Sequence, residues 1–242
     1  MPEPATTELS PVRLQELLLE HPALDGFLAA LACDLAGHLA EWDVSGASIT
    51  VVRPRRQTVH AGSGPGVSAS GQSAADPASG VLTTGLPVVV RHLGGRMRQT
   101  AAPGAVPGAD AAAFASVPVP VPLAGAGAGG AVLTVYSEHP GAFGPEAVQA
   151  VERAAAEAAA AVALALRLDA LTHRAENLQA ALESRTVVDL AAGIIMAQNN
   201  CSQQSAVDIL RSVSNSRNVK VRDIAAGVVA VVSDRVSTHF EE

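Results

Sequence analysis

The sequence predicts an α+β protein in which an antiparallel sheet flanked by helices precedes a long coiled-coil linker helix and a C-terminal all-α three-helix bundle. Three observations predict this fold class. Apolar residues recur every three or four positions over residues 11–39, and short β-branched runs punctuated by Gly and Pro follow as far as residue 136. A long helical pattern then opens at Pro145.

The N-terminal part combines helical and strand patterns. Residues 11–39 are expected to be helical with a break at His21-Pro22, and residues 73–85 form a second helix that Gly85 ends. Strands are expected at residues 47–52, 57–61, 86–91, 115–123 and 130–136. The first two and the last two should each form a hairpin.

The strand at 115–123 carries prolines at every second position, which places them on one face. Because proline cannot donate a hydrogen bond to a neighbouring strand, this pattern favours an edge strand over a central one.

The long helix contains a heptad pattern of leucines, which indicates a coiled-coil linker over residues 164–184. Its apolar positions recur in steps of 4, 3, 4, 3 and 4, which is a little under three repeats. They are Leu164, Leu168, Leu171, Ala175, Leu178 and Leu182. This seam favours a homodimer, and packing of the helix against its own domain is the alternative.

Three helical segments follow from about residue 184. The first ends near Asn199, the second begins after Ser202 as N-cap, and the third begins after Asn218. The second segment is expected to bury four apolar side chains: Ala206, Ile209, Leu210 and Val213. A unit of about 50 residues has a thin core, so we expect it to depend on the coiled coil or on a partner.

Charge is distributed unevenly. The chain has a net charge of −7, yet residues 209–222 hold four cations, including the only lysine, Lys220, and no acid. Such a run is typical of a surface that binds a polyanion, and the acidic balance of the chain confines that contact to one patch.

Other features bound the class of protein. Cys33 and Cys201 lack metal-ligand spacing and are expected to be free buried thiols of a reducing compartment. Neither a signal peptide nor a membrane-spanning segment is recognisable, so a soluble cytoplasmic protein without membrane contact is expected.

The C-terminal segment resembles the ANTAR domain, the RNA-binding module of bacterial transcription antiterminators. The matching residues are Ala191, Gly193, Ile194, Ile195, Met196, Cys201, Ser202, Ala206, Leu210, Arg211, Ser214, Asn218, Lys220, Asp223, Ile224 and Ala225. The resemblance implies a three-helix domain, over residues 182–236, that binds paired stem-loops in nascent leader RNA and prevents transcription termination. Similar proteins carry a lysine where this chain has Ala192 and a basic residue after Met196, so phosphate attraction should be weaker here.

Cationic and amide side chains in this segment are the candidate RNA contacts. They are Arg185, Gln198, Arg211, Ser214, Asn215, Arg217, Asn218, Lys220 and Arg222. Arg and Lys pair with phosphates, and Asn and Ser can reach the edges of splayed loop bases. As alternatives, Arg211 can be a solvated helix-end cation, and Ser214 and Asn218 can be helix caps.

Residues 11–166 resemble a GAF domain, after a start at residues 1–10 that is expected to be disordered. The resemblance is carried by GLPVVV at 85–90, by SVPVPVPL at 116–123 and by GGAVLTVYSEHPGAF at 129–143. It implies a sensor with a pocket for a small-molecule effector on one face of the sheet. Arg91, Arg96 and Arg98 can grip an anionic effector or belong to a solvated loop, and His60 and His92 lack partners at metal spacing.

No catalytic constellation is recognisable. The glycine-rich run at 124–130 joins two strands and does not open a helix, which is unlike a phosphate cradle. Ser63 and Ser68 have no base at a recognisable spacing. We therefore expect a regulator that is not an enzyme, with no cofactor and no metal. A DNA-binding regulator, or a sensor whose C-terminal bundle docks a protein partner, are the alternatives.

Overall fold

The computed structural model describes residues 9–53, 56–63, 77–92, 111–121 and 130–237. It divides into two compact units, Met1–Asp169 and Ala170–Glu242. Several residues named above lie outside the described ranges: Ser68, Arg96, Arg98 and the glycine-rich run up to Gly129.

The N-terminal unit is built on a five-stranded antiparallel sheet in the order β2-β1-β5-β4-β3. The strands are β1 (Gly46–Val51), β2 (Val59–Ser63), β3 (Val88–Val90), β4 (Ala113–Val119) and β5 (Ala131–Ser137). The two expected hairpins, β1–β2 and β4–β5, are confirmed by their pairing.

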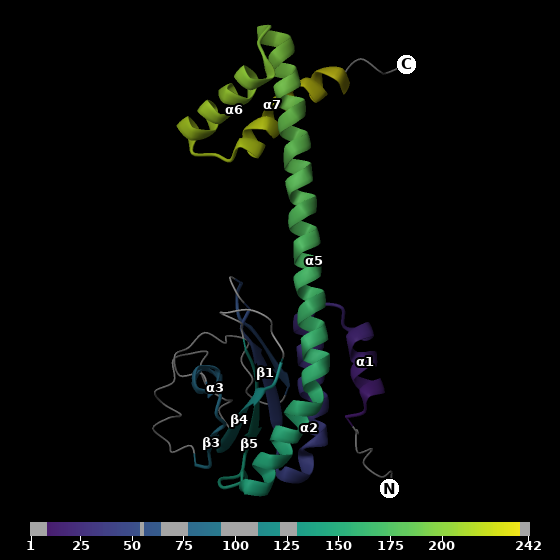
Figure 1. The fold of residues 1–242 in the computed structure, drawn as a ribbon, viewed down its shortest axis with the longest axis vertical. Helices are drawn as coiled ribbons and strands as arrows, with labels where there is room; N and C mark the ends of the chain where they lie inside the picture. Colours follow the sequence, from purple (N-terminus) through teal and green to yellow (C-terminus); the bar gives the residue numbers. More distant parts are fainter. Residues whose placement is uncertain (1–8, 54–55, 64–76, 93–110, 122–129, 238–242) are drawn as a thin grey trace. The chain divides into compact units, whose positions relative to one another are not determined.

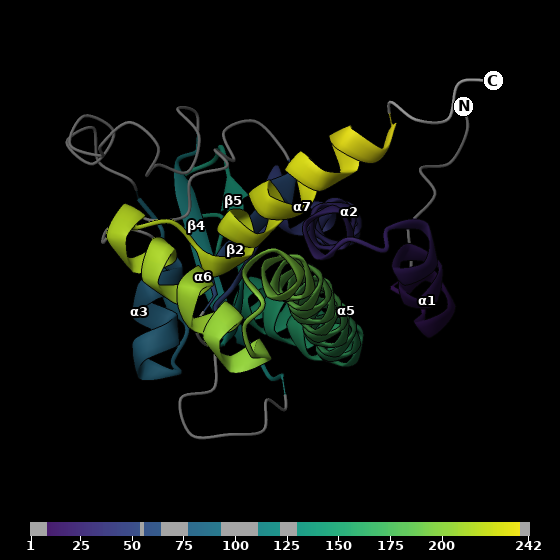
Figure 2. The same ribbon diagram turned by 90° about the horizontal axis from the view of Figure 1, so that it is seen from above.

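Helices cover both faces of this sheet (Figures 1 and 2). They are α1 (Pro11–Glu20), α2 (Leu24–His38), the 3-10 turn η1 (Ala40–Trp42), α3 (Pro77–Thr84) and α5 (Pro145–Asn199). α2 and the first part of α5 cover one face, with α1 packed beside them, and α3 lies on the other. The predicted fold class is therefore confirmed, including the break at His21-Pro22.

The main core lies between the sheet and α2 with α5. Alternate strand residues such as Ile49, Leu133 and Val117 face it, and they meet Phe27 and Leu31 of α2. The first part of α5 contributes mainly alanines, whose small side chains let the helix lie close to the sheet.

The predicted edge position of the proline strand is wrong for the strand as a whole, because β4 lies between β5 and β3. β3 pairs only with Phe114, Ala115 and Ser116. Pro118 pairs with Val132 on the β5 side, beyond the last β3 partner. Within the described residues β4 is thus central in its first half and an edge at Pro118, and an edge is where a proline is tolerated in a sheet.

An ionic cluster joins the β1–β2 connection to α5. Asp169 on α5 accepts hydrogen bonds from Nη1 of Arg53, at 3.1 and 3.2 Å to its two oxygens, and from Arg56. Nε and Nη2 of Arg53 also donate to the carbonyl of Gln57, at 3.1 and 2.9 Å. The side chains of Arg53 and Asp169 are only 15% and 17% exposed, so this cluster is shielded more than the ion pairs of the C-terminal unit.

The C-terminal unit consists of the last part of α5 with α6 (Gln203–Arg217) and α7 (Val221–Ser237). The expected first helix of the bundle is therefore the end of α5 and not a separate element. Its buried cluster comprises Ala191, Ala192, Ile195, Ala206, Leu210 and Ala225. Most of these side chains are alanines, so the predicted thin core is confirmed.

Two expectations about burial are wrong. Ile209 is 42% exposed and Val213 only half-buried, because α6 turns both toward an open groove and not into the core. Cys33 is exposed on the outer side of α2, although both cysteines are free thiols as expected.

None of the helices in the described part of the chain combines the length and the apolar character that crossing a membrane would require.

Candidate nucleic-acid interface

The turn from α5 into α6 is formed by local capping. Asn200 adopts a left-handed conformation (φ 51°), which ends α5 and redirects the chain. Ser202 is the N-cap of α6, and its Oγ accepts a hydrogen bond from the amide of Ser205 at 3.2 Å, as the sequence predicts.

The turn from α6 into α7 is fixed by Ser214 and Asn218. Ser214 is buried, and its hydroxyl donates to the carbonyl of Val219 at 2.6 Å. Asn218 is the C-cap of α6 in a left-handed conformation, with φ 52° and ψ 40°. Asn218 thus has the capping role that was the alternative to RNA contact. Ser214 is not a cap, because it lies within α6, but its hydroxyl is engaged by the carbonyl of Val219.

The cations of the candidate site fall into two groups. Arg185, Arg211 and Arg222 lie within 3.7–3.8 Å of Asp189, Asp208 and Asp223 respectively. All three pairs are exposed to solvent, so each contributes little stability and leaves the guanidinium accessible to a phosphate.

Arg217 and Lys220 form the other group. In the described ranges neither forms an ion pair, and both are exposed at the turn between α6 and α7. Among the candidates they are therefore the cations that have no carboxylate partner within the part of the chain that the structure describes. They lie three positions apart in the sequence, at the two ends of the turn.

The surface formed by the acid-free run at 209–222 is less positive than the run itself, because acids just outside it pair with two of its cations. Asp208 and Asp223 flank the run directly, and they pair with Arg211 and Arg222. The window ends one residue short of an acid on each side, so half of its cations have a carboxylate neighbour. Residues three positions apart are neighbours on a helix, so the spacing of Asp208 and Arg211 in the sequence already indicated that they are close.

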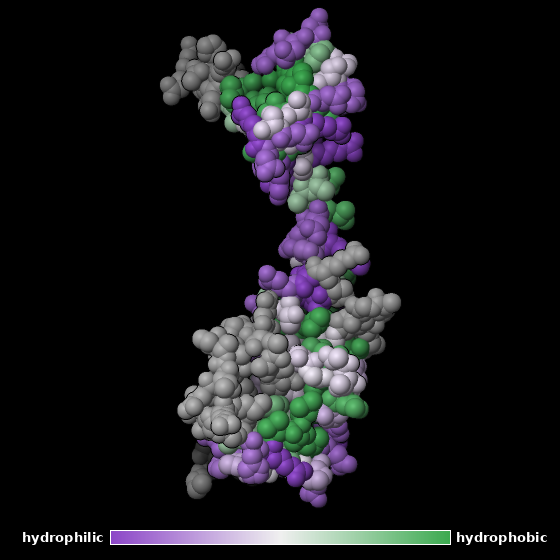
Figure 3. Space-filling model, turned by 90° about the vertical axis from the view of Figure 1, so that its left-hand side faces the viewer, coloured by the Kyte–Doolittle hydropathy of each residue, from purple (hydrophilic) through white to green (hydrophobic). Residues whose placement is uncertain are grey.

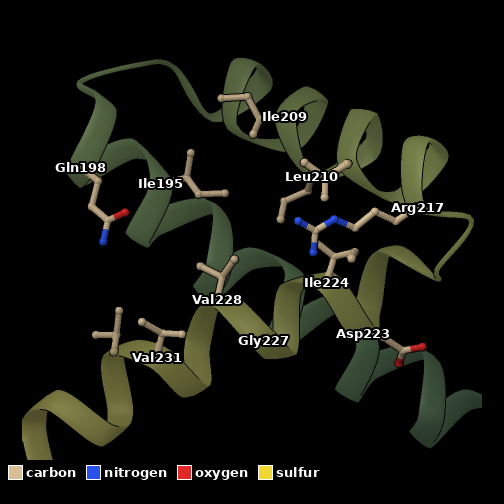
Figure 4. A pocket seen from close by; sticks show the side chains of 12 residues that line it. Ile195, Gln198, Ile209, Leu210, Arg217, Asp223, Ile224, Gly227, Val228 and Val231 are labelled. Atoms are coloured by element: carbon tan, nitrogen blue, oxygen red, sulfur yellow. The ribbon is translucent and has the colours of Figure 1, made fainter.

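A groove of about 490 Å³ lies beside this turn, between the end of α5, α6 and α7 (Figure 4). Its lining is mostly aliphatic: Ile195, Ile209, Leu210, Val213, Ile224, Val228, Val231 and Val232. The polar residues along it are Gln198, Arg217 and Asp223. In Figure 4 the guanidinium of Arg217 reaches toward Leu210 and Ile224, whereas the carboxylate of Asp223 points away.

The groove brings two of the candidate residues, Gln198 and Arg217, to one surface, and does not include Arg185, Arg211 or Asn215. Sequence analysis did not find this feature. Ile209 and Val231 of its lining are exposed aliphatic side chains. Figure 3 shows hydrophobic surface on the C-terminal unit. Apolar residues beyond those needed for the small core were the signal that could have indicated it.

The departure at Ala192 has a structural counterpart. Ala192 lies on the last part of α5 and is buried in the core cluster of the C-terminal unit. In this chain the position therefore offers no exposed point for a phosphate contact.

On the N-terminal unit, hydroxyl groups are paired on the face of the sheet opposite the main core. Ser48 Oγ lies 2.9 Å from the hydroxyl of Tyr136, and Ser116 Oγ lies 2.9 Å from Thr134 Oγ1. Thr50 Oγ1 lies 2.8 Å from Nδ1 of His60. His60 is thus a partner of this polar layer, while Arg91 and His92 are exposed after β3.

In the described part of the chain, no three His, Cys, Asp or Glu residues are arranged to hold a metal ion.

The chain thus combines an antiparallel-sheet unit with a small helical unit that presents two cations without an ion pair in the described ranges. Residues 176–229 match the family model of the ANTAR domain. The C-terminal unit thus carries an ANTAR domain, the domain of RNA-binding antitermination regulators. No curated protein matches the chain.

Several solved structures are similar to the N-terminal part. The GAF domain of the phosphoenolpyruvate-protein phosphotransferase from Acinetobacter is 19% identical, covers 65% of this chain and 96% of its own, and has a TM-score of 0.44. The corresponding GAF domain from Coxiella burnetii is 14% identical, covers 69% of this chain and 99% of its own, and has a TM-score of 0.42. The free methionine-R-sulfoxide reductase from Neisseria meningitidis, in complex with its substrate, is 17% identical, covers 71% of this chain and 95% of its own, and has a TM-score of 0.46.

Proposed function

We propose that this protein is a signal-responsive regulator whose ANTAR domain binds paired stem-loops in nascent leader RNA and so prevents transcription termination. The observation that carries the proposal is the pair of uncompensated cations, Arg217 and Lys220, at the α6–α7 turn of the ANTAR domain. Phosphates of a folded transcript are the polyanion that such a patch attracts.

The groove beside the turn supplies a second type of contact. Bases of RNA loops are unstacked, and they can lie on an aliphatic surface or on the plane of an arginine. Arg217 lies along this groove with Gln198, which has both a donor and an acceptor for a base edge. We therefore assign phosphate contact to Lys220 and contact with an unpaired loop base to Arg217 and Gln198.

The protein acts as a homodimer in this proposal. The leucines of the heptad seam are 47–67% exposed on α5, although Leu residues at heptad spacing are usually buried against a second helix. Two ANTAR domains held together would bind two stem-loops at once, which multiplies affinity through effective concentration.

The N-terminal unit is assigned to effector sensing. The paired hydroxyls of Ser48, Tyr136, Ser116 and Thr134 give one face of its sheet a polar, uncharged character. A small molecule rich in hydrogen-bonding groups fits that chemistry better than an apolar one.

RNA affinity under matched salt conditions tests the proposal. The full chain is titrated with a leader RNA that contains two stem-loops before a terminator, with the same RNA carrying scrambled loops, and with duplex DNA. We expect the paired stem-loops to bind at least tenfold more tightly than the other two. Equal affinity for all three would leave only nonspecific polyanion binding, and preference for the duplex would favour a DNA-binding regulator.

Charge variants locate the contact. Arg217→Ala/Lys220→Ala should weaken RNA binding through loss of both contacts, and it should lower the salt dependence by about one counterion, because only Lys220 is assigned to a phosphate. The matched control is Arg167→Ala/Arg174→Ala, which removes two exposed arginines of α5 ahead of the ANTAR domain. An equal loss in both variants would show that net charge, and not this turn, determines affinity.

A further inference from the structure

The ionic cluster of Arg53, Arg56 and Asp169 lies where α5 leaves the sheet of the N-terminal unit. The side chains that α5 buries in the main core end at Leu166, and the boundary between the two compact units follows directly after Asp169. From residue 167 to residue 190 no residue of α5 is buried. Within the described ranges, Asp169 therefore makes the last hydrogen bonds between α5 and another segment of the N-terminal unit.

Arg53 joins both ends of the β1–β2 connection to this point. Its Nη1 donates to the two oxygens of Asp169, while its Nε and Nη2 donate to the carbonyl of Gln57. Arg53 follows β1 by two positions, and Gln57 precedes β2 by two. Because one guanidinium holds both ends of the connection, a displacement of either strand end lengthens the bonds to Asp169.

The polar face of the sheet begins close to this connection. Thr50 and His60 are paired in the β1–β2 register, and Thr50 Oγ1 lies 2.8 Å from Nδ1 of His60. Thr50 precedes Arg53 by three positions, and His60 follows Gln57 by three. An effector that exchanges hydrogen bonds with this pair thus acts on the strand ends that carry the cluster.

On its other side the cluster adjoins the heptad seam. Leu168, the neighbour of Asp169, and Leu171 are 47% and 58% exposed. Successive residues of a helix are about 100° apart around its axis, so a helix held through Asp169 presents these leucines in a fixed direction. The cluster therefore fixes the rotation of α5 about its axis at the start of the seam.

We propose that this cluster is the contact through which the N-terminal unit controls RNA binding by the ANTAR domain. When it is closed, it anchors α5 at the start of the linker. When it is open, the stretch from 167 to 190 has no anchor and no buried residue, and helices without such support are marginal in water. The two ANTAR domains of a dimer then lose their fixed spacing, so the gain from binding two stem-loops at once decreases. This inference rests on the proposed function and names its regulation.

The composition of the cluster suits a contact that opens. Two guanidinium groups share one carboxylate, so the closed state brings two like charges together and offsets only one of them. This repulsion reduces the free-energy difference between the closed and the open state. An effector shifts such an equilibrium through its difference in affinity for the two states, and a smaller free-energy difference requires a smaller difference in affinity.

Hydrogen–deuterium exchange of the full-length protein without RNA tests the anchor. Asp169→Asn removes the charge and keeps the shape, and we expect the amides of residues 167–175 to exchange about fivefold faster, while those of β1 and β5 keep their protection. Asp169→Glu retains a carboxylate and should restore most of the protection. Glu152→Gln, the same change of charge at an exposed position of α5, should leave the exchange unchanged.

RNA affinity tests the control of binding. Two leader RNAs are titrated under the same salt conditions, one with both stem-loops and one with a single stem-loop. Asp169→Asn should weaken binding of the paired stem-loops about tenfold and leave binding of the single stem-loop unchanged, because only the first depends on the spacing of two domains. A variant that is merely less folded would lose affinity for both RNAs equally.

Three results overturn the inference: exchange identical to that of wild type, unchanged affinity for the paired stem-loops, or an equal loss of affinity for both RNAs. If Asp169→Asn also loses the protection of β1 and β5, Arg56→Gln replaces it, because that variant keeps the bonds between Arg53 and Asp169. The same pattern at a smaller size is then expected. Failure of the proposed function differs, because it appears in the wild-type protein, which would bind paired stem-loops no better than duplex DNA, and that result overturns both.

Discussion

The two units of this protein are stabilised in different ways. In the N-terminal unit a sheet and two helices enclose large side chains such as Phe27, Leu31, Ile49 and Leu133. In the C-terminal unit alanines dominate the buried cluster, while Ile209 and Val231 remain exposed. A small helical unit with so little buried area has only a few kcal/mol of stability of its own. The comparison predicts that the N-terminal unit folds independently and that the C-terminal unit depends on what covers it.

The two units also differ in how their polar side chains are paired. On the sheet, buried hydroxyls are paired with one another at hydrogen-bonding distance. In the C-terminal unit the charged side chains are exposed and weakly paired or unpaired. Paired buried groups keep one rigid arrangement, whereas exposed cations remain free to bind an external polyanion.

The largest expected effect comes from truncation of one leucine in each core. Leu133→Ala and Leu210→Ala should each cost about 3 kcal/mol, because both side chains are fully buried. In the N-terminal unit this loss of free energy of unfolding lowers the melting temperature. In the C-terminal unit the same loss removes most of the free energy of unfolding. Differential scanning calorimetry should show two transitions in wild type, with the weaker one lost in Leu210→Ala only. Retention of the weaker transition would contradict the contrast between the cores.

A smaller effect is expected from the ionic cluster of the N-terminal unit. Asp169→Asn leaves Arg53 and Arg56 close together without their carboxylate, and should cost about 2 kcal/mol, the range for hydrogen bonds to a shielded charge. Asp189→Asn, which removes the exposed partner of Arg185, should change stability by less than about 0.5 kcal/mol. Chemical denaturation followed by circular dichroism measures both. Similar values for the two variants would mean that burial of the cluster has no energetic consequence.

Gly227→Leu tests the groove of the ANTAR domain. Gly227 lines the groove, and a Cβ added there would meet no heavy atom within 4 Å outside its chain neighbours and its own helix backbone, so a side chain at this position has room to start into the groove. Because leucine favours a helix over glycine by about 1 kcal/mol, stability should rise while RNA affinity falls about tenfold. Ala226→Leu, at the neighbouring exposed position of α7 outside the groove lining, is the control. A loss of affinity in both variants would point to a general effect of apolar surface.

The elements that sequence predicts well are those determined locally. Ser202 as N-cap, Pro145 at the start of α5 and the break at His21-Pro22 each depend on the residue itself and its neighbours. The central position of β4 depends on a short partner strand far away in sequence, and the Arg53–Asp169 contact joins residues 116 positions apart. Single-sequence patterns do not contain such pairings.

The candidate site illustrates the same division. Its cations were identified from composition, but which of them are compensated depends on helical neighbours: Asp208 and Asp223 lie just outside the run that drew attention. The groove depends on how three helices pack, and only the surplus of apolar residues in α6 and α7 indicated it. Ser214 and Asn218 could be assigned only once the turn geometry was known.

The smallest expected effect concerns one of these flanking acids. Asp208→Asn should strengthen RNA binding about two- to threefold, because Arg211 loses its exposed carboxylate neighbour at 3.7 Å and the unit becomes more positive. Filter binding at two salt concentrations measures the change, which should shrink at the higher salt as screening increases. Glu152→Gln, an equal change of charge on the N-terminal unit, should leave affinity unaltered. If Asp208→Asn has no effect either, Arg211 lies outside the RNA contact, and binding is confined to the uncompensated turn of Arg217 and Lys220.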